Sequence, residues 1–386
     1  MIRSRVALVG GLGITQLLAW GSTYYLLSVL APTIAAENGW SLSSVIGGLS
    51  AGLLASGLVS PFIGRRIERH GGRAVLAGGA LLLALGLAAL GLARSFPAFI
   101  LAWLVIGIGM GASLYDPAFA TLGRLYGAKA RTAITIITFF GGLSSTVCWP
   151  LSAGLLAEVG WRGTCFTYAA IELCFAFPIF LLVVPPAPAP ASPLEEGRRA
   201  APPTRPALFA LVAGALTLGS VIASVLSLHA LTLMERLNVA VPTAVALGTI
   251  VGPSQVIARI LEITFGRRFH PVATMLVSAI LVSAAMPLLL WGVPGLVMGL
   301  ILYGGGNGLL AIARGTLPLA LFGVTGYAVR LGRIARWSLL AQSLSPWLAA
   351  LLLDHAGANA LILALAGIAL IEAAASFLLV RPAWRR

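Results

Sequence analysis

Long apolar runs, separated by short polar segments, recur along the whole chain of 386 residues. A helix needs roughly 20 apolar residues to cross a hydrocarbon core about 30 Å thick. The pattern predicts twelve such spans, at 6–30, 42–63, 74–93, 97–122, 133–156, 163–184, 207–232, 243–263, 272–291, 295–320, 335–353 and 359–380. We therefore expect an all-α protein that crosses a lipid bilayer twelve times.

Composition and charge fit this picture. The chain is 59% hydrophobic and only 9% charged, which leaves too few polar residues to cover a water-facing globule. A net charge of +14 would suggest a nucleic-acid partner in a soluble protein. Here the basic residues gather in alternate loops, and the opposite loops hold only Arg94, Arg162 and Arg236. This bias predicts cytoplasmic termini and no nucleic-acid partner. The chain uses arginine almost exclusively, with Lys129 as the single lysine, which is typical of a GC-rich bacterial genome. We therefore expect the protein in a bacterial cytoplasmic (inner) membrane.

A proline-rich segment at 185–206 predicts a cytoplasmic linker between two six-helix bundles, 1–184 and 207–386. Two features recur on both sides of it. The segment that starts at Gly64 resembles the one that starts at Ala258, and three alternate glycines occur in the fourth and the tenth span: Gly107, Gly109 and Gly111, and Gly304, Gly306 and Gly308. Two pseudo-symmetric six-helix halves with a long central loop are typical of transporters that rock around a substrate near the midplane.

The segment from Gly64 to Arg73 resembles the signature of the major facilitator superfamily, G-x-x-x-D-R-x-G-x-R. Gly64, Arg69, Gly71 and Arg73 match it, and Glu68 replaces the aspartate. The resemblance implies the major facilitator fold. It also implies that the charges of Glu68, Arg69 and Arg73 form a gate latch at the cytoplasmic ends of the helices. The alternative is a solvated basic loop that only sets topology. By the internal repeat, Glu262 corresponds to Glu68 in the second half.

Two other features of the family fit less well, because Trp103 stands where an arginine is expected and the fifth span keeps only scattered glycine and proline. Spans 4 and 8 are similar to the monocarboxylate and oxalate/formate branch. That branch has a tyrosine in helix 4 and, in helix 8, an arginine preceded four residues earlier by a polar side chain. Tyr115, Gln255 and Arg259 occupy these places. The resemblance implies a small organic anion as substrate.

Ionisable residues inside spans are costly and therefore mark candidate sites. Gln255 and Arg259 share a helical face, and a guanidinium suits bidentate capture of a carboxylate. We expect Arg259 to hold a substrate anion and Gln255 to orient it. The alternative is that Arg259 pairs with Glu262 one turn later.

Asp116 is a candidate carrier of a coupling proton, since a desolvated carboxylate binds a proton more tightly than one in water. The alternative pairs it with the latch arginines Arg69 or Arg73. Tyr115 lies on the stripe of Gly107 and Gly111, where a phenol would meet the substrate, although glycine stripes also serve helix packing.

Three further polar residues are candidates for lining the substrate path. Tyr24 faces the cavity or packs in the core, Asn307 lies where backbones approach closely, and His229 lies near the outer end of span 7, where it titrates in the external vestibule or is simply interfacial.

The sequence offers no metal-ligand cluster, phosphate loop or catalytic triad, so we expect no enzyme, no metal and no cofactor. We predict a secondary transporter, working as a monomer, that moves a monocarboxylate-like anion with protons by alternating access. The alternative is a proton-coupled exporter of drugs or other amphipathic compounds.

Overall fold

The computed structural model describes residues 5–186 and 205–380. The two chain ends and most of the predicted linker (187–204) lie outside the described residues. The described part contains helices and no strand. The helices are α1 (Arg5–Ser22), α2 (Leu26–Asn38), α3 (Leu42–His70), α4 (Arg73–Leu92), α5 (Phe96–Ser113), α6 (Tyr115–Tyr126), α7 (Ala130–Gly142), α8 (Ser144–Ile171), α9 (Phe177–Val183), α11 (Pro206–Arg236), α12 (Val241–Gly248), α13 (Val251–Thr264), α14 (Pro271–Leu288), α15 (Gly292–Phe322) and α16 (Tyr327–Leu378).

Within the described residues, nine helical stretches are long and apolar enough to cross a membrane. Two of them are far longer than one crossing requires: 88 residues at Phe96–Val183 and 52 residues at Tyr327–Leu378. A straight helix of 88 residues would measure roughly 130 Å, so this stretch must reverse direction. Gly127 between α6 and α7, Gly160 in α8 and Gly357 in α16 stand at such reversals with φ of 56°, 68° and 81°, values that glycine adopts without steric penalty. The longer stretch therefore crosses three times and the shorter one twice. The predicted all-α, twelve-span architecture is confirmed.

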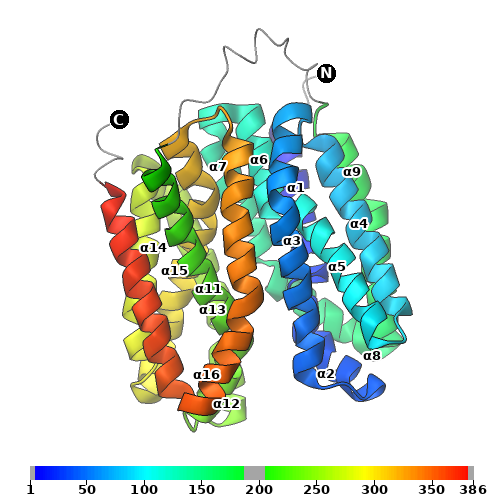
Figure 1. The fold of residues 1–386 in the computed structure, drawn as a ribbon, viewed down its shortest axis with the longest axis vertical. Coiled ribbons are helices and arrows are strands. Elements are labelled where there is room, and N and C mark those ends of the chain that lie inside the picture. Colours follow the sequence, from blue (N-terminus) through cyan, green and yellow to red (C-terminus); the bar gives the residue numbers. More distant parts are fainter. Residues whose placement is uncertain (1–4, 187–204, 381–386) are drawn as a thin grey trace. The chain divides into compact units, whose positions relative to one another are not determined.

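The described residues group into two compact units (Figure 1). The first comprises the described residues of Met1–Pro202 together with Gly323–Ser343, and the second comprises those of Pro203–Phe322 and Leu344–Arg386. The start of α16 thus belongs to the first unit. The predicted boundaries at 184 and 207 remain a prediction.

Each unit has its own apolar core. The core of the first unit is built from α1 to α5 and α8 and contains the fully buried rings of Phe99, Trp103, Trp161 and Tyr168. The core of the second unit is mostly aliphatic, with Tyr303 and Met286 among its buried residues. Many large apolar side chains elsewhere are exposed, Leu58 and Trp291 among them, as expected where lipid replaces water around the protein.

The glycine stripes pack helices in the same way in both units. A Cβ on Gly107 of α5 would lie 2.1 Å from the carbonyl oxygen of Gly52 in α3. In the second unit, a Cβ on Gly304 of α15 would lie 2.8 Å from the Val251 carbonyl oxygen of α13. Gly109 and Gly306 face the other way, toward α4 and α14. The sequence repeat is therefore a repeat of close backbone contacts.

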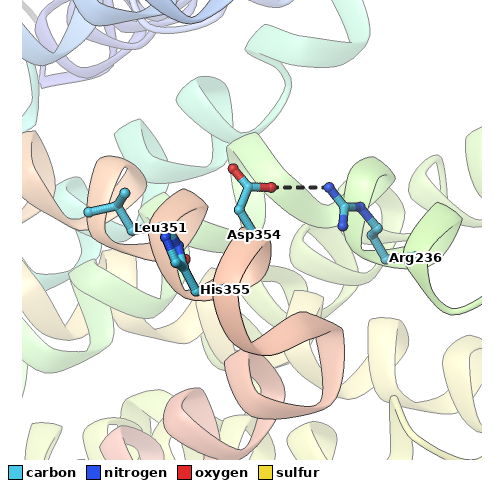
Figure 2. Close-up of polar contacts among 4 residues, drawn as sticks. All are labelled: Arg236, Leu351, Asp354 and His355. Atoms are coloured by element: carbon cyan, nitrogen blue, oxygen red, sulfur yellow. Dashed lines mark hydrogen bonds and ion pairs between the residues drawn. The ribbon is translucent and has the colours of Figure 1, made fainter.

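One surface ion pair ties the end of α11 to α16 in the second unit (Figure 2). Arg236 Nη2 lies 3.0 Å from Asp354 Oδ1, and both side chains are more than half exposed. His355 follows Asp354 in α16, and its Nδ1 lies 2.9 Å from the carbonyl oxygen of Leu351. An exposed pair of this kind contributes about 0–1 kcal/mol to stability.

Candidate functional site

The segment with the family signature is mostly helical. α3 continues to His70, because no glycine or proline occurs between Gly64 and Gly71, which has a φ of 76°. The segment expected as a loop from Gly64 is therefore the last turns of α3, and only Gly71 and Gly72 separate α3 from α4. This is a correction to the sequence-based picture, and it places Glu68 on a rigid helix.

Glu68 caps the N-terminus of α16. Its Oε1 accepts a hydrogen bond from the Gly326 backbone N–H (3.1 Å), and its Oε2 accepts one from the Ala328 N–H (3.2 Å). The first N–H groups of a helix have no partner within the helix, and the helix dipole favours a negative charge there. Glu68 thus holds the start of α16 through hydrogen bonds to its backbone, and its charge also interacts with Arg330 in the first turn of that helix.

The arginines expected in the latch behave differently from one another. Arg69 is exposed, and the structure gives it no hydrogen bond or ion pair within the described residues. Arg73 has a buried Nε without a hydrogen-bond partner among the described residues. Instead, Nη1 of Arg124, at the end of α6, donates to the backbone carbonyl of Glu68. Arg124 was missed, since only its position between spans 4 and 5 was used to assign topology.

Small residues allow α3 and α16 to approach closely beside Glu68. A Cβ on Gly64 would lie 2.4 Å from the Ala328 carbonyl oxygen, and one on Gly332 would lie 2.5 Å from that of Ser60. Larger residues at either position would separate the two helices. Gly64 therefore contributes close packing, and Glu68 contributes the polar contact.

Asp116 lies next to this contact and is half-buried. With Ser60, Gly64 and Ala328, it lines a small cavity between α3, α6 and α16. It interacts electrostatically with Tyr327, the first residue of α16. Neither Arg69 nor Arg73 makes an ion pair within the described residues, so the alternative role of Asp116 as their partner gains no support.

The fourth span is broken at Leu114, between α5 and α6. Proline has no N–H, so Pro117 cannot donate to the Ser113 carbonyl four residues earlier. Gln16 of α1 supplies the missing donor, with its Nε2 2.8 Å from the Ser113 oxygen. Gln16 is fully buried and was not among the predicted site residues. The proline was the signal in the sequence, but the donor that compensates for it lies 97 residues away.

An aromatic cluster surrounds this break. Its centre is Trp20, whose ring centroid lies 4.9 Å from that of Tyr115 and 5.3 Å from that of Tyr24. Tyr115 is buried, stacks on Phe119, and donates from its hydroxyl to the Thr138 carbonyl (3.1 Å). The cluster continues through Tyr25, which contacts both Tyr24 and Trp149. The structure thus brings the predicted residues Tyr24 and Tyr115 together around Trp20.

The eighth span is broken in an analogous way between α12 and α13, at Thr249–Ile250. Pro253 removes the donor for the Thr249 carbonyl and explains the break. The helix that follows carries Gln255 and Arg259 one turn apart, and Arg259 Nη2 lies 3.2 Å from Gln255 Oε1. The predicted pair is therefore in contact.

Arg259 is a buried cation with unused hydrogen-bond donors. Its side chain is only 3% exposed, and its Nε and Nη1 have no hydrogen-bond partner among the described residues. Glu262 is also buried and accepts a hydrogen bond from the Thr274 hydroxyl (2.9 Å), and no ion pair joins it to Arg259. A buried guanidinium with free N–H groups is costly unless an anion completes it.

Asn307 and His229 occupy different surroundings in the second unit. Asn307 is half-buried and makes no hydrogen bond within the described residues, while its neighbour Gly308 packs on the Gln255 backbone. The glycines thus bring α15 against the helix that carries Gln255. The side chain of His229 makes a hydrogen-bond contact, with its Nε2 2.9 Å from the Pro346 carbonyl oxygen.

No group of three or more His, Cys, Asp or Glu residues that could hold a metal ion occurs in the described part of the chain. The arrangement offers instead a buried cation with free donors, an aromatic cluster and a carboxylate that caps a helix. These groups suit recognition and conformational change.

Comparison with known proteins identifies the family. The model of the Major Facilitator Superfamily matches residues 12–332. The 3-(3-hydroxy-phenyl)propionate transporter of Escherichia coli K12 is 28% identical over 176 residues, which are 45% of this chain and 40% of that protein.

Three solved structures share the fold along nearly the whole chain, each with a TM-score of 0.75. The human organic anion transporter MFSD10 is 22% identical, with 97% of this chain and 100% of that one covered. FucP in the outward conformation is 14% identical, with 97% and 99% covered, and the proton:xylose symporter XylE bound to 6-bromo-6-deoxy-D-glucose is 14% identical, with 96% and 94% covered. At these identities the likeness establishes the fold alone.

Proposed function

Since the chain belongs to the Major Facilitator Superfamily, we propose that it is a secondary transporter that moves a monocarboxylate-like anion together with protons by alternating access. Arg259 would bind the carboxylate, and Gln255 would orient the guanidinium. Tyr24, Tyr115, Asn307 and His229 would line the substrate path.

The burial of Arg259 is the observation that carries this proposal. Its only hydrogen-bond partner in the described residues is the neutral Gln255, and two of its nitrogens are left with unused donors. A carboxylate would accept two parallel N–H bonds from such a group. Because the contact with Gln255 fixes one nitrogen, the guanidinium would be oriented before the anion arrives, which lowers the entropic cost of binding.

The relative from Escherichia coli supports the substrate class. The compound in its name, 3-(3-hydroxy-phenyl)propionate, is a monocarboxylate. The match covers less than half of either chain, so the transfer of this chemistry to our protein is part of the proposal.

Asp116 would carry the coupling proton. Its place beside Tyr327, and in the cavity next to the contact of Glu68 with α16, supports this role. Loss or gain of its charge would change the electrostatics at the start of α16. That segment is also the one that the carboxylate of Glu68 holds.

Glu68, with Arg124, Gly64 and Gly71, would act as the gate latch at the cytoplasmic side. The hydrogen bonds from α16 to Glu68 can form in one conformation and open in the other, as alternating access requires. The protein would lie in a bacterial cytoplasmic membrane, and the charge bias of its loops supports an orientation with both termini inside.

Uptake of labelled short and aromatic carboxylates into proteoliposomes, with and without an imposed pH gradient, tests the proposal. We expect uptake of at least one acid to depend on the gradient. Arg259→Gln should reduce it at least about tenfold, because a hydrogen-bonded charge pair is worth about 1.5–3 kcal/mol. Arg259→Lys should retain part of the activity, since it keeps the charge but loses the planar fork.

Arg236→Gln is the matched control, because it removes an arginine of the same unit from an exposed ion pair. It should transport like the parent. If no carboxylate moves, or if Arg259→Gln transports like Arg236→Gln, the proposal is wrong. Amphipathic cations would then be the next compounds to test as exported substrates.

A further inference from the structure

Two buried polar atoms on α1 have no hydrogen-bond partner among the described residues. They are the Oε1 of Gln16, an acceptor, and the Nε1 of Trp20, a donor. The two residues are one helical turn apart and therefore share a face of α1. Gln16 is fully buried. A buried polar group without a partner is costly and calls for an explanation.

Both side chains lie at the same place in the first unit, the break of the fourth span. The amide nitrogen of Gln16 is bonded to Ser113, just before the break, and the ring of Trp20 contacts Tyr115, just after it. The hydrogen bond to Ser113 uses the nitrogen of the Gln16 amide, so the oxygen is the atom without a hydrogen-bond partner. Its oxygen is free because its nitrogen compensates for Pro117.

The surroundings of these atoms are aromatic. The rings of Tyr24, Tyr25 and Tyr115 all lie within 6.4 Å of that of Trp20. The cluster reaches the surface of the unit, since Tyr24 and Tyr25 are only half-buried and Trp149, which contacts Tyr25, is 43% exposed. Aromatic side chains bind other rings by offset or edge-to-face contacts.

We propose that this cluster is a subsite for an aromatic ring that bears a hydroxyl group. The hydroxyl donates to Gln16 Oε1 and accepts from Trp20 Nε1, while the rings of Trp20, Tyr24 and Tyr115 contact the ring of the ligand. The inference rests on the proposed function, because the ring belongs to the transported anion. It narrows the substrate class to hydroxylated aryl carboxylates.

The two buried atoms without a partner, Gln16 Oε1 and Trp20 Nε1, favour a hydroxyl over other polar groups on the ligand. A hydroxyl both donates and accepts, so it satisfies both atoms at once. A carboxylate has no proton to give to the Gln16 oxygen, and an ammonium group has no lone pair for the Trp20 N–H. An unsubstituted ring would leave both atoms unpaired. Sites that are built to bond a hydroxyl discriminate strongly against the analogue that lacks it.

Trp103 provides an internal comparison. Its Nε1 is also buried and without a partner, but its ring packs on Phe99 and on Gly48 in the core of the unit. It therefore offers a control: the same chemical change at another buried indole nitrogen without a partner, outside the proposed subsite.

Calorimetric binding of three acids to the full-length protein in nanodiscs tests the inference. The acids are 3-(3-hydroxyphenyl)propionate, 3-phenylpropionate and butyrate. We expect the parent to bind the hydroxylated acid about tenfold or more tightly than 3-phenylpropionate. Trp20→Phe keeps a ring but loses the donor, so the preference for the hydroxylated acid over 3-phenylpropionate should fall by about fivefold. Trp103→Phe should keep the preference of the parent.

The outcomes separate this inference from the proposed function. If the acids bind in a manner that depends on Arg259 but the parent does not prefer the hydroxylated ring, the subsite is wrong and the function stands. The same holds if Trp20→Phe and Trp103→Phe change the preference equally. If none of the three acids binds to the parent, both proposals fail. The measurement on the parent decides the question even if Trp20→Phe does not fold.

Discussion

The equivalent parts of the two units share their packing but differ in their chemistry. In the first unit α5 packs on α3 through Gly107, and in the second α15 packs on α13 through Gly304. The carboxylates that correspond in sequence do different things. Glu68 accepts hydrogen bonds from two backbone N–H groups at the start of α16, whereas Glu262 accepts a hydrogen bond from the hydroxyl of Thr274 in α14.

The helix breaks also fall in different places. Pro117 breaks the fourth span in the first unit, while the corresponding tenth span, α15, is continuous. In the second unit Pro253 breaks the eighth span instead, while the corresponding second span, α3, is continuous. Both repeats keep the glycines that allow close helix packing, because packing depends on the shape of the backbone. The polar side chains at corresponding positions make different contacts in the two repeats. A sequence repeat therefore indicates a shared scaffold more safely than a shared site.

The largest effect should come from breaking the shared packing. Gly107→Ala and Gly304→Ala should each destabilise the protein by about 1–3 kcal/mol, because the added methyl group meets backbone atoms of the facing helix. Gly305→Ala is the control, since its Cβ would meet no atom closer than 3.6 Å. Thermal unfolding in detergent measures the difference. Equal melting temperatures for all three variants would contradict the assigned role of the stripes.

A smaller effect should distinguish the two carboxylates. Glu68→Gln removes the charge that the start of α16 faces, so amide exchange at Gly326 and Ala328 should accelerate by about fivefold, equivalent to about 1 kcal/mol. Glu262→Gln, the matched change in the second unit, should leave these amides unaffected. Hydrogen exchange read by mass spectrometry follows both variants. Similar acceleration in the two would mean that Glu68 does not hold α16 through the bonds described.

The smallest effect concerns the two arginines of the second unit. Arg236 is exposed and paired with Asp354, whereas Arg259 is buried and has unused donors. Arg236→Gln should change the free energy of unfolding by no more than about 1 kcal/mol, as for other surface pairs. The melting temperature in low and in high salt measures this contribution. A large loss would show that the corner at the end of α11 depends on the pair.

The sequence by itself determined the membrane class, the twelve spans and the repeat. These properties depend on local features: the apolar content of about 20 consecutive residues, or the glycine that permits close approach. The breaks at Pro117 and Pro253 also have a local cause, the missing N–H of a proline, but the spans at 97–122 and 243–263 were predicted as unbroken. The pairing of Gln255 with Arg259 was equally accessible, since residues four apart share a helical face. For the same reason, the two candidate residues of span 8 were found in contact.

Only the tertiary structure decided which groups satisfy one another across the chain. Glu68 reaches Gly326, 258 residues away, and Gln16 reaches Ser113, 97 residues away. Neither contact leaves a periodic signal in the sequence. It also decided that Arg259 does not pair with Glu262 and that Arg69 stands apart from the contact it was expected to join. Hydropathy and spacing determine which span, and which face of its helix, carries a side chain. A hydrogen bond also needs a partner within about 3 Å, and for these residues the packing of distant helices supplies that partner.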